Sequence, residues 1–389
     1  MRKIIIIAII LALIPQACGK VLYVGRGDYE KIQDAIDDAN FFDIIIVYPG
    51  IYNENITISK PISLEGENAV ISGEIFILAN NVNVSGFIIN NSILEGISIK
   101  GNRNVIKNCS IFSNSYGIKI EGEENVISDN KIFKNGFYGI YLYFFSKNNT
   151  ITKNEIYGSK VGIYIEKATD NIIFENVIKN NSAGMIIQGG ENNLIRLNNF
   201  SGNLEGIHIC CYSKNNTIFE NNFIGNSNHV YCYAGKNIWN LSNGNYWDNL
   251  SGNIFFIDDK NIDYLPSKFP YEIGNFSYRI YIFYPEENAT VSEKIVIHGM
   301  IERDGIVRIK IDGGEWENAT GIYLWYYEID TKNLSNGKHE IYVEFEGNIV
   351  SRTIYVKNKK SIPSFEMFLI ILAFLLIFKN RKNYLRNNH

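Results

Sequence analysis

The stretch GIYIEKATDNIIFENVIKNNSAG, residues 162–184, is one period of a pattern that occurs six times between Gly96 and Asn228. A glycine followed by alternating apolar residues recurs every 21 to 23 residues, at Gly96, Gly117, Gly139, Gly162, Gly184 and Gly206. Such a short fixed period is typical of a solenoid, whose units bury a core only by stacking on their neighbours. The repeat therefore predicts coils of about 22 residues.

The residue types within each period indicate which kind of solenoid is present. Three short β-branched or aromatic runs occur per period, and in the quoted stretch they are residues 163–165, 172–174 and 177–178. A leucine-rich repeat has a similar length, but the repeated positions here hold Ile and Val, and no segment of the repeat has helical spacing. Three strands per coil predict an all-β parallel β-helix with coils about 4.8 Å apart.

Asparagines form two columns in step with the glycines. The first holds Asn104, Asn125, Asn149, Asn171, Asn193 and Asn216, and the second, five residues further along, holds Asn130, Asn154, Asn176, Asn198 and Asn221. Because an amide carries both donors and an acceptor, such a column can hydrogen-bond along the solenoid axis. Cys109 takes the first place of the second column, where we expect a small buried side chain.

Composition sets broad limits on function. The chain has 389 residues, is 46% hydrophobic and carries a net charge of -4. No basic stripe with interleaved aromatic residues occurs outside the two termini, which argues against a nucleic-acid partner. The 25 Tyr and 23 Phe residues favour strands.

Both ends of the chain carry targeting features. Arg2 and Lys3 precede an apolar run over 4–14 and a small-x-small site at 17–19, which predicts a signal peptide over residues 1–19. A lipid-modified Cys18 is an alternative, although residues 15–17 favour plain cleavage.

At the other end, an apolar run over 367–378 is followed by Lys379, Arg381, Lys382 and Arg386. The run is shorter than the roughly 20 residues of a membrane span, but its basic flank is typical of a cytoplasmic stop-transfer. We expect residues 361–389 to anchor a secreted protein at the cell surface, with a packing helix as the alternative. Fourteen Asn-x-Ser/Thr sites between Asn55 and Asn333 fit a surface glycoprotein.

Residues 28–40 are expected to close the first coil. Apolar residues at Ile32, Ala35, Ile36 and Ala39 have helical spacing, and Asp28 is the expected N-cap. The buried strand 44–48 and the turn Pro49-Gly50 follow. An amphipathic helix laid across the end of a solenoid covers its apolar core and strand edges.

The repeat elements Gly-Ile-x-Ile and Asn-x-Ile-x-x-Asn resemble the NosD-like, carbohydrate-binding and sugar-hydrolysis group of right-handed parallel β-helix proteins. The segment over 47–55 is similar to the opening of that group and of pectin methylesterases, and residues 244–248, GNYWD, resemble its closing motif. The resemblance covers roughly residues 21–270 and implies the fold of a β-helix domain over 20–270, whereas the group is functionally mixed.

One departure from the family pattern concerns calcium. Archaeal members commonly follow the Asn-Tyr-Trp motif with an acidic, glycine-rich run that suits calcium. Here residues 251–259 replace that run and leave Asp258, Asp259 and Asp263 as oxygen ligands. Calcium prefers six to eight oxygens, so we expect no metal there. We also expect no cofactor elsewhere in the chain.

Residues 278–357 have longer alternating runs and turn motifs such as Asp312-Gly-Gly314. About seven strands at this spacing predict a small β-sandwich domain, which resembles the Ig-like modules of archaeal and bacterial surface proteins. The tail from Pro363 resembles an archaeal C-terminal sorting and anchoring signal.

The charged residues give no positive sign of catalysis. One column holds Asp129, Lys153, Glu175, Leu197 and Glu220, and neighbouring coils alternate in sign, as do Lys131 and Glu155 beside it. This pattern indicates cross-strand pairing on a solvated face rather than a carboxylate pair for sugar hydrolysis. No phosphate-binding loop, nucleophile elbow or zinc-protease motif occurs. The predicted set of catalytic residues is therefore empty, and an enzyme acting on polysaccharide stays an alternative.

The strand after each repeat glycine offers a candidate binding face. If Ile140, Leu142, Ile163, Ile165, Ile207 and Ile209 point inward, the alternation directs Tyr141, Tyr143, Tyr164, Glu166, Gln188, His208, Tyr231 and Tyr233 outward. Aromatic faces pack against sugar rings, and polar neighbours bind sugar hydroxyls. Stacking that serves stability alone is the competing interpretation.

A second candidate site combines thiols and imidazoles, at His208, Cys210, Cys211, His229 and Cys232. Such ligands suit Cu(I) or zinc, and the resemblance to a copper-associated family suggests a copper-handling protein as an alternative. Cys232 aligns with inward Ile209, however, so the ligands do not converge. A disulfide from Cys232 to Cys210 or Cys211 is favoured over metal binding, with buried thiols as a further alternative.

These observations predict a secreted, membrane-tethered β-helix followed by an Ig-like stalk. Its expected role is glycan binding or envelope structure. A polysaccharide lyase, hydrolase or epimerase and a NosD-type copper-handling protein are the alternatives.

Overall fold

The computed structural model describes residues 19–233, 235–273, 280–301, 305–321, 324–345 and 347–358. Residues 1–18 of the predicted signal peptide and the whole predicted anchor, 361–389, lie outside these ranges. The chain divides into two compact units, Met1–Asn275 and Phe276–His389. Within the described ranges, no helix is both long enough and apolar enough to cross a membrane.

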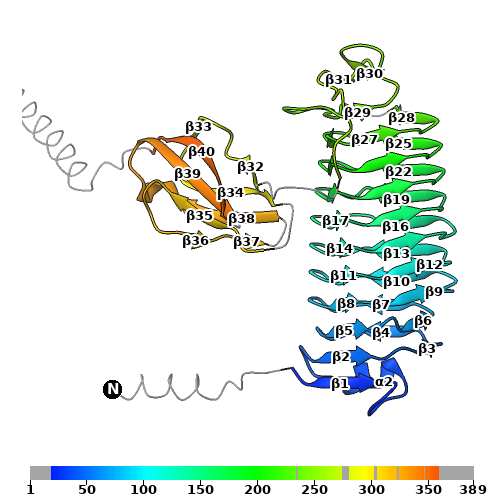
Figure 1. The fold of residues 1–389 in the computed structure, drawn as a ribbon. Coiled ribbons are helices and arrows are strands. Elements are labelled where there is room, and N and C mark those ends of the chain that lie inside the picture. Colours follow the sequence, from blue (N-terminus) through cyan, green and yellow to red (C-terminus); the bar gives the residue numbers. More distant parts are fainter. Residues whose placement is uncertain are drawn as a thin grey trace, which may run out of the picture. The chain divides into compact units, whose positions relative to one another are not determined.

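The first unit is a right-handed parallel β-solenoid of about ten coils, drawn from blue to green in Figure 1. Sheet 1 holds β1 (Val21–Val24), β2 (Ile44–Val47), β5 (Ser63–Gly66), β8 (Asn83–Ser85), β11 (Val105–Lys107), β14 (Val126–Ser128), β17 (Thr150–Thr152), β20 (Ile172–Phe174), β23 (Leu194–Arg196) and β26 (Thr217–Phe219). Sheet 2 holds β4 (Ile56–Ile58), β7 (Ile75–Ile77), β10 (Glu95–Ile99), β13 (Tyr116–Ile120), β16 (Tyr138–Leu142), β19 (Val161–Glu166), β22 (Ala183–Gln188), β25 (Glu205–Cys210) and β28 (Asn228–Cys232). Sheet 3 holds β3 (Ile51–Tyr52), β6 (Val70–Ser72), β9 (Ile88–Asn90), β12 (Ser110–Phe112), β15 (Lys131–Phe133), β18 (Glu155–Tyr157), β21 (Val177–Lys179), β24 (Asn199–Ser201), β27 (Asn222–Ile224) and β29 (Tyr246–Trp247).

The core of this unit is a set of inward columns, and the predicted inward residues of sheet 2 are confirmed. Ile140, Leu142, Ile163, Ile165, Ile207 and Ile209 are all fully buried. Ile140 pairs with Ile163 and Leu142 with Ile165 in the parallel register, so each coil repeats the burial of the coil before it. Because each strand is only a few residues long, stacking of coils rather than strand length supplies the buried area.

The repeated glycines lie where neighbouring coils approach most closely. A Cβ atom at Gly139 would lie 2.6 Å from the carbonyl oxygen of Gly162, and one at Gly162 would lie 2.5 Å from that of Gly184. The first marker of the sequence repeat thus has a steric cause, because any larger residue pushes the coils apart.

Gly162→Ala is expected to lower the free energy of unfolding by about 1–3 kcal/mol, since the added methyl group meets backbone and the Ile178 side chain at 2.7 Å. Gly136→Ala is the matched control, because a Cβ there has its nearest neighbour at 3.7 Å. Denaturant unfolding followed by circular dichroism measures both changes. Equal stability of the two variants would contradict this steric explanation.

Each coil bends at three corners of the same design. At each corner a residue with left-handed φ precedes a buried ladder residue, as in Asp170 (φ 57°), Glu175 (φ 56°) and Asn180 (φ 54°). The two predicted Asn columns are confirmed, and their amides bond from coil to coil, for example from Asn154 Nδ2 to Asn176 Oδ1 at 3.0 Å. A third column at the third corner was not predicted and comprises Asn114, Asn135, Asn181, Asn203 and Asn226, with Ser159 in one coil.

The N-terminal helix covers the first coil as predicted, but its predicted N-cap is wrong. Helix α2 spans Ile32–Asp38, its N-cap position is Lys31, and Lys31 makes no side-chain cap. The backbone N–H groups of Ile32 and Gln33 instead donate to the Glu54 carboxylate at 2.9 and 3.1 Å. A side chain from the next coil therefore supplies the negative charge that a helix N-terminus favours.

The other end of the solenoid is closed by a hairpin of β30 (Phe255–Asp258) and β31 (Asn261–Asp263). The first Asn ladder ends on Asn261 and the second on Asp263, whose oxygens accept from Asn237 N and Asn245 N at 2.9 and 2.7 Å. Asp258 accepts from the Lys260 and Asn261 backbone N–H groups. Two of the three aspartates considered for calcium thus hold the end of the coil stack.

The second unit consists of two sheets that share one apolar core. The four-stranded sheet has the order β32 (Ile280–Tyr284), β34 (Lys294–Ile301), β38 (Leu324–Asp330) and β37 (Thr320–Gly321). The five-stranded sheet has the order β33 (Ala289–Val291), β40 (Asn348–Val356), β39 (Gly337–Phe345), β35 (Arg308–Ile311) and β36 (Glu317–Asn318), and a 3₁₀ turn occupies Thr331–Asn333. The described residues form nine strands rather than about seven, because β36 and β37 are short additions.

Candidate functional site

The predicted binding face is the outer surface of sheet 2. Its central column runs in register through Tyr141, Tyr164, Ile186, His208 and Tyr231. The neighbouring column contains Glu166, Gln188 and Cys210. Ile186 interrupts the aromatic column, because each coil supplies its own residue at this position and only the alternation is fixed by the fold.

The first half of the column is packed against itself. Tyr164 is only 8% exposed, and its hydroxyl donates to Gln188 Oε1 at 2.6 Å. The Tyr141 hydroxyl donates to the Glu166 carboxylate. Burial, together with this hydrogen bond, raises the pKa of Tyr141, and burial raises the pKa of Tyr164. Both phenols therefore stay protonated donors whose bonds are already made within the protein.

Two further tyrosines join this packed half. Tyr138 lies 4.5 Å from Tyr164 and 5.1 Å from Tyr141 between ring centroids, and Tyr116 lies 5.4 Å from Tyr138. Both tyrosines directly precede a repeat glycine, so their position in the sequence pattern could have identified them. Tyr143 also packs at 5.2 Å from Tyr141, while Lys119 Nζ lies 4.3 Å above the Tyr143 ring.

The second half of the column is open to solvent. Tyr231 and Tyr233 are 48% and 57% exposed. With His208 they form a cluster in which ring centroids lie 5.0 to 5.6 Å apart. His208 Nδ1 lies 2.8 Å from Glu205 Oε2. Exposed rings beside a carboxylate and an imidazole can pack on an apolar ring face and exchange hydrogen bonds with its substituents.

The candidate cysteines and histidines are not brought together, which agrees with the register expected from the sequence. Cys232 pairs with the inward residue Ile209, and His229 Nε2 lies 2.8 Å from Asp248 Oδ1. Cys210 and Cys211 lie side by side with their sulfur atoms 2.8 Å apart. Burial lowers the pKa of His229, and burial raises the pKa of Cys210 to about 11. In the described part of the chain, no group of three such residues has the geometry of a metal site.

The favoured disulfide is also wrong. Cys109, Cys210, Cys211 and Cys232 form no disulfide bond among the described residues. The sequence pattern places Cys210 and Cys232 in neighbouring coils but in different columns, because the first occupies the Gln188 position and the second the Ile209 position. A small buried side chain at Cys109 is confirmed.

The alternating charges form ion pairs between coils, as predicted. Lys131 and Lys179 both contact Glu155, at 3.9 and 2.7 Å, and Lys153 contacts Glu175 at 3.9 Å. The pair between Arg196 and Glu220 differs because both side chains are buried. The prediction of a solvated face is therefore wrong for this end of the column.

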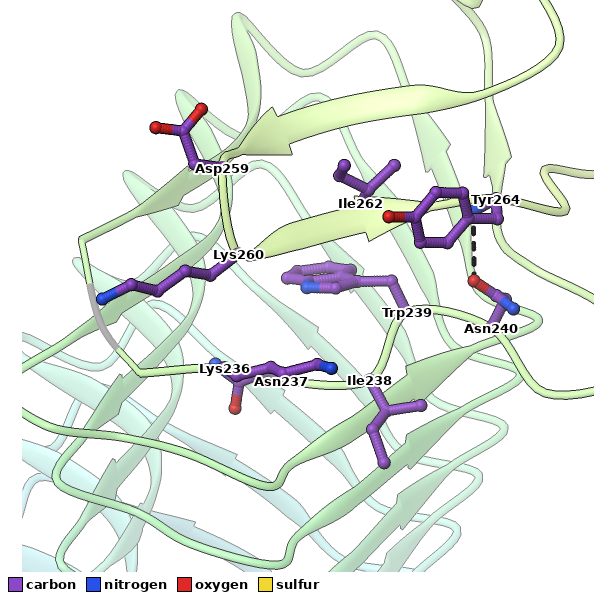
Figure 2. Close-up of a pocket in the computed structure, with 9 residues that line it drawn as sticks. All are labelled: Lys236, Asn237, Ile238, Trp239, Asn240, Asp259, Lys260, Ile262 and Tyr264. Carbon is purple, nitrogen blue, oxygen red and sulfur yellow. Dashed lines mark hydrogen bonds between the residues drawn. The ribbon is translucent and has the colours of Figure 1, made fainter.

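A pocket of about 500 Å³ lies at the closed end of the solenoid, and no predicted site residue lines it. Figure 2 shows the Trp239 indole among the lining residues and the Asp259 carboxylate directed away from them. The Trp239 indole N–H donates to Asn261 Oδ1 at 3.1 Å, and Tyr264 N donates to Asn240 Oδ1 at 3.0 Å. These bonds hold the end hairpin on the last coil. The residues that line the pocket therefore have a structural role, and the pocket is not evidence of a ligand site.

The model of the family described as periplasmic copper-binding protein (NosD) matches residues 43–252. A cell surface glycoprotein of Methanothermus fervidus is 49% identical over 70 residues, which cover 16% of this chain and 12% of that protein.

Among solved structures, an alginate lyase from Paenibacillus sp. str. FPU-7 has a TM-score of 0.43 and 17% identity, covering 55% of this chain and 86% of its own. The pectate lyase Pel9A has a TM-score of 0.40 and 14% identity, covering 56% of this chain and 79% of its own.

Proposed function

This chain belongs to the NosD family, and on that premise we propose that it is a cell-surface β-helix protein that binds glycan on the outer face of sheet 2. The observation that carries the proposal is the exposed cluster of His208, Tyr231 and Tyr233 beside Glu205. Aromatic rings accept the apolar faces of sugars, and the carboxylate accepts hydrogen bonds from sugar hydroxyls.

A surface location is supported by the match to a cell surface glycoprotein and by the sites for Asn-linked glycans. Eight Asn-x-Ser/Thr asparagines are exposed: Asn55, Asn108, Asn180, Asn215, Asn249, Asn288, Asn318 and Asn333. In this proposal the signal peptide directs export, the second unit is an Ig-like stalk, and residues 361–389 anchor the chain in the membrane.

The copper named in the family description does not fit this chain. His208 and Cys210 lie in neighbouring columns of one strand, while Cys232 occupies an inward position and His229 is engaged by Asp248. Soft-metal sites require converging thiolates and imidazoles. The described residues contain no such convergence, so the proposal assigns this chain no copper chemistry.

Replacing both Tyr231 and Tyr233 with Ala is expected to weaken glycan binding at least about tenfold, since two exposed ring contacts are lost. A glycan array with the full chain identifies the ligand, and titration calorimetry measures the change. The control is a double replacement of Tyr326 and Tyr355, which are similarly exposed in the second unit. Wild-type protein that binds no glycan on the array, or a double variant that binds as wild type, would refute the proposal.

A further inference from the structure

Two turns at the edge of sheet 2 are one residue longer than the turns between them. From Leu142 to the bridged residue Lys147 the chain advances five residues, as it does from Ile209 to Lys214. From Ile165 to Thr169 and from Ile187 to Glu191 it advances only four. The long turns, residues 143–146 and 210–213, therefore project at equivalent places in two coils.

Each long turn presents one aromatic residue to solvent. Phe145 is 76% exposed and Tyr212 is 89% exposed, and both have left-handed φ values of 64° and 68°. The turns are closed alike, by Ser146 N donating to Tyr143 O and Ser213 N donating to Cys210 O at 3.1 and 3.2 Å. A bulky residue with positive φ is uncommon. Neither ring is buried there, and Phe145 makes an edge contact with Phe144, 6.1 Å between ring centroids. The repetition of this arrangement in register points to a use outside the fold.

The surface between the two long turns carries polar side chains, and its turns project less because they are one residue shorter. The shorter turns carry Lys167 and the Gly189-Gly190 pair, and the adjoining strand ends carry Glu166 and Gln188. Lys167 Nζ lies 4.8 Å above the Phe144 ring. Tyr141 and Tyr164 each donate to one oxygen of these two side chains. Glu166 Oε1 and Gln188 Nε2 make no hydrogen bond to any other described residue, so both can bind a ligand.

The register fixes the length of this surface. The column Lys147, Thr169, Glu191 and Lys214 is continuous, so three coil steps separate the long turns. At about 4.8 Å per step, the two long turns are about 14 Å apart along the axis. One further step reaches Tyr233. A disaccharide is too short to contact both turns at once, so a ligand that reaches both must be a longer, extended sugar chain.

We infer that the ligand of the proposed function is an extended oligosaccharide segment lying along the solenoid axis, bracketed by Phe145 and Tyr212, with Glu166 and Gln188 bonded to its hydroxyls. The inference rests on the proposed glycan-binding function and adds its orientation and minimum length. The two rings pack against sugars near opposite ends of the segment, and the lower middle turns leave room for the chain.

The test is titration calorimetry of the full chain with two oligomer series of two to six residues, one of β-1,4-linked glucose and one of β-1,4-linked mannuronate. Affinity for the series that binds is expected to rise at least about tenfold between two and five residues and then to level off. Phe145→Asn and Tyr212→Asn, which tolerate positive φ, are each expected to weaken binding of the five-residue oligomer about tenfold and to leave the dimer unchanged.

Phe42→Asn is the matched control, because Phe42 is an exposed aromatic residue with a φ of 68° far from this surface. Equal affinity for two and five residues, or retained affinity in both turn variants, would overturn the inference and leave the proposed function standing. Wild-type protein that binds neither series and no glycan on the array would overturn both.

Discussion

Glu220→Leu is expected to lower the free energy of unfolding of the solenoid by about 3–5 kcal/mol, because it removes the carboxylate that faces a buried guanidinium. Arg196 is 1% exposed, and its Nε and Nη2 groups both lie 2.8 Å from Glu220 Oε2. The second carboxylate oxygen accepts from Asn243 Nδ2 at 2.8 Å. Chemical denaturation of the full chain measures the loss.

Replacing both Arg196 and Glu220 separates two contributions to the loss of stability: the cost of a buried charge without its partner, and the loss of the contact itself. Arg196→Met combined with Glu220→Leu is expected to regain most of the stability, since apolar side chains of similar size fill a buried ion-pair site at little cost. Arg196 also lies 5.5 Å from the Phe219 ring centroid, so a methionine at this position keeps an aromatic neighbour.

An exposed pair serves as the matched control. Arg103 and Glu124 lie 3.2 Å apart, and both side chains are more than half exposed. Glu124→Gln is expected to change stability by no more than about 1 kcal/mol, because solvent already screens that pair. A loss of similar size in the two single variants would contradict the assignment of the larger effect to burial.

The fold of the solenoid was predictable because the residues that determine it recur in every coil of the repeat. A glycine where coils touch, inward Ile positions and Asn at the corners recur in step, so each element is predicted several times over. The third Asn column carries the same signal at Asn114, Asn135 and Asn181, so it was equally predictable from the sequence. The predicted N-cap of the helix was wrong because the side chain that accepts from its first N–H groups, Glu54, belongs to a neighbouring coil.

The candidate site was less predictable, since alternation gives only the direction of a side chain. Tyr164 and Tyr231 are both outward, yet their exposures are 8% and 48%. What covers Tyr164 is the set of rings on neighbouring coils, which depends on which residue each coil happens to supply. The long turns were already visible in the sequence, because the interval from repeat glycine to Asn marker is ten residues after Gly139 and Gly206 and nine after Gly162 and Gly184. The exposure of their aromatic residues was not predictable from that spacing.

Asn176→Ala is expected to cost about 3–5 kcal/mol in unfolding free energy, because the side chain makes five hydrogen bonds in a fully buried column. Its Oδ1 accepts from the backbone N–H and the amide of Asn154, both at 3.0 Å. Its Nδ2 donates to Ile151 O, Phe174 O and Asn198 Oδ1, at 2.8 to 3.0 Å. Alanine leaves these buried partners unsatisfied and leaves a cavity.

Denaturant unfolding again measures the change, with Asn53→Ala as the control at an exposed position. Hydrogen exchange gives a second readout, because the Asn154 backbone N–H loses its acceptor in the variant and should exchange faster than its neighbours. Unchanged protection of the Asn154 amide would contradict the stabilising role assigned to the Asn176 side chain.

The direction of the ladder explains why its end differs from its middle. Each Asn side chain of the second column accepts from the Asn of the coil before it and donates to the Asn of the coil after it. The last side chain of the column has no following Asn to donate to, so it needs only acceptor atoms. Asp263 occupies that place, and it accepts from Asn245 N, Trp247 Nε1 and Leu265 N at 2.7 to 3.1 Å. Burial raises the pKa of Asp263, while these donors oppose the shift.

A carboxylate in the middle of the column has no such donors on its second oxygen. In Asn176→Asp that oxygen would face the acceptors Ile151 O, Phe174 O and Asn198 Oδ1. The ionised form is disfavoured, so the folded-state pKa of the new carboxyl rises above its unfolded value of about 3.9. The folded state then binds more protons, and the free energy of unfolding falls as pH rises above about 4. Stability relative to wild type should thus recover in acid for Asn176→Asp and not for Asn176→Ala, whereas parallel pH profiles would refute the ladder's polarity.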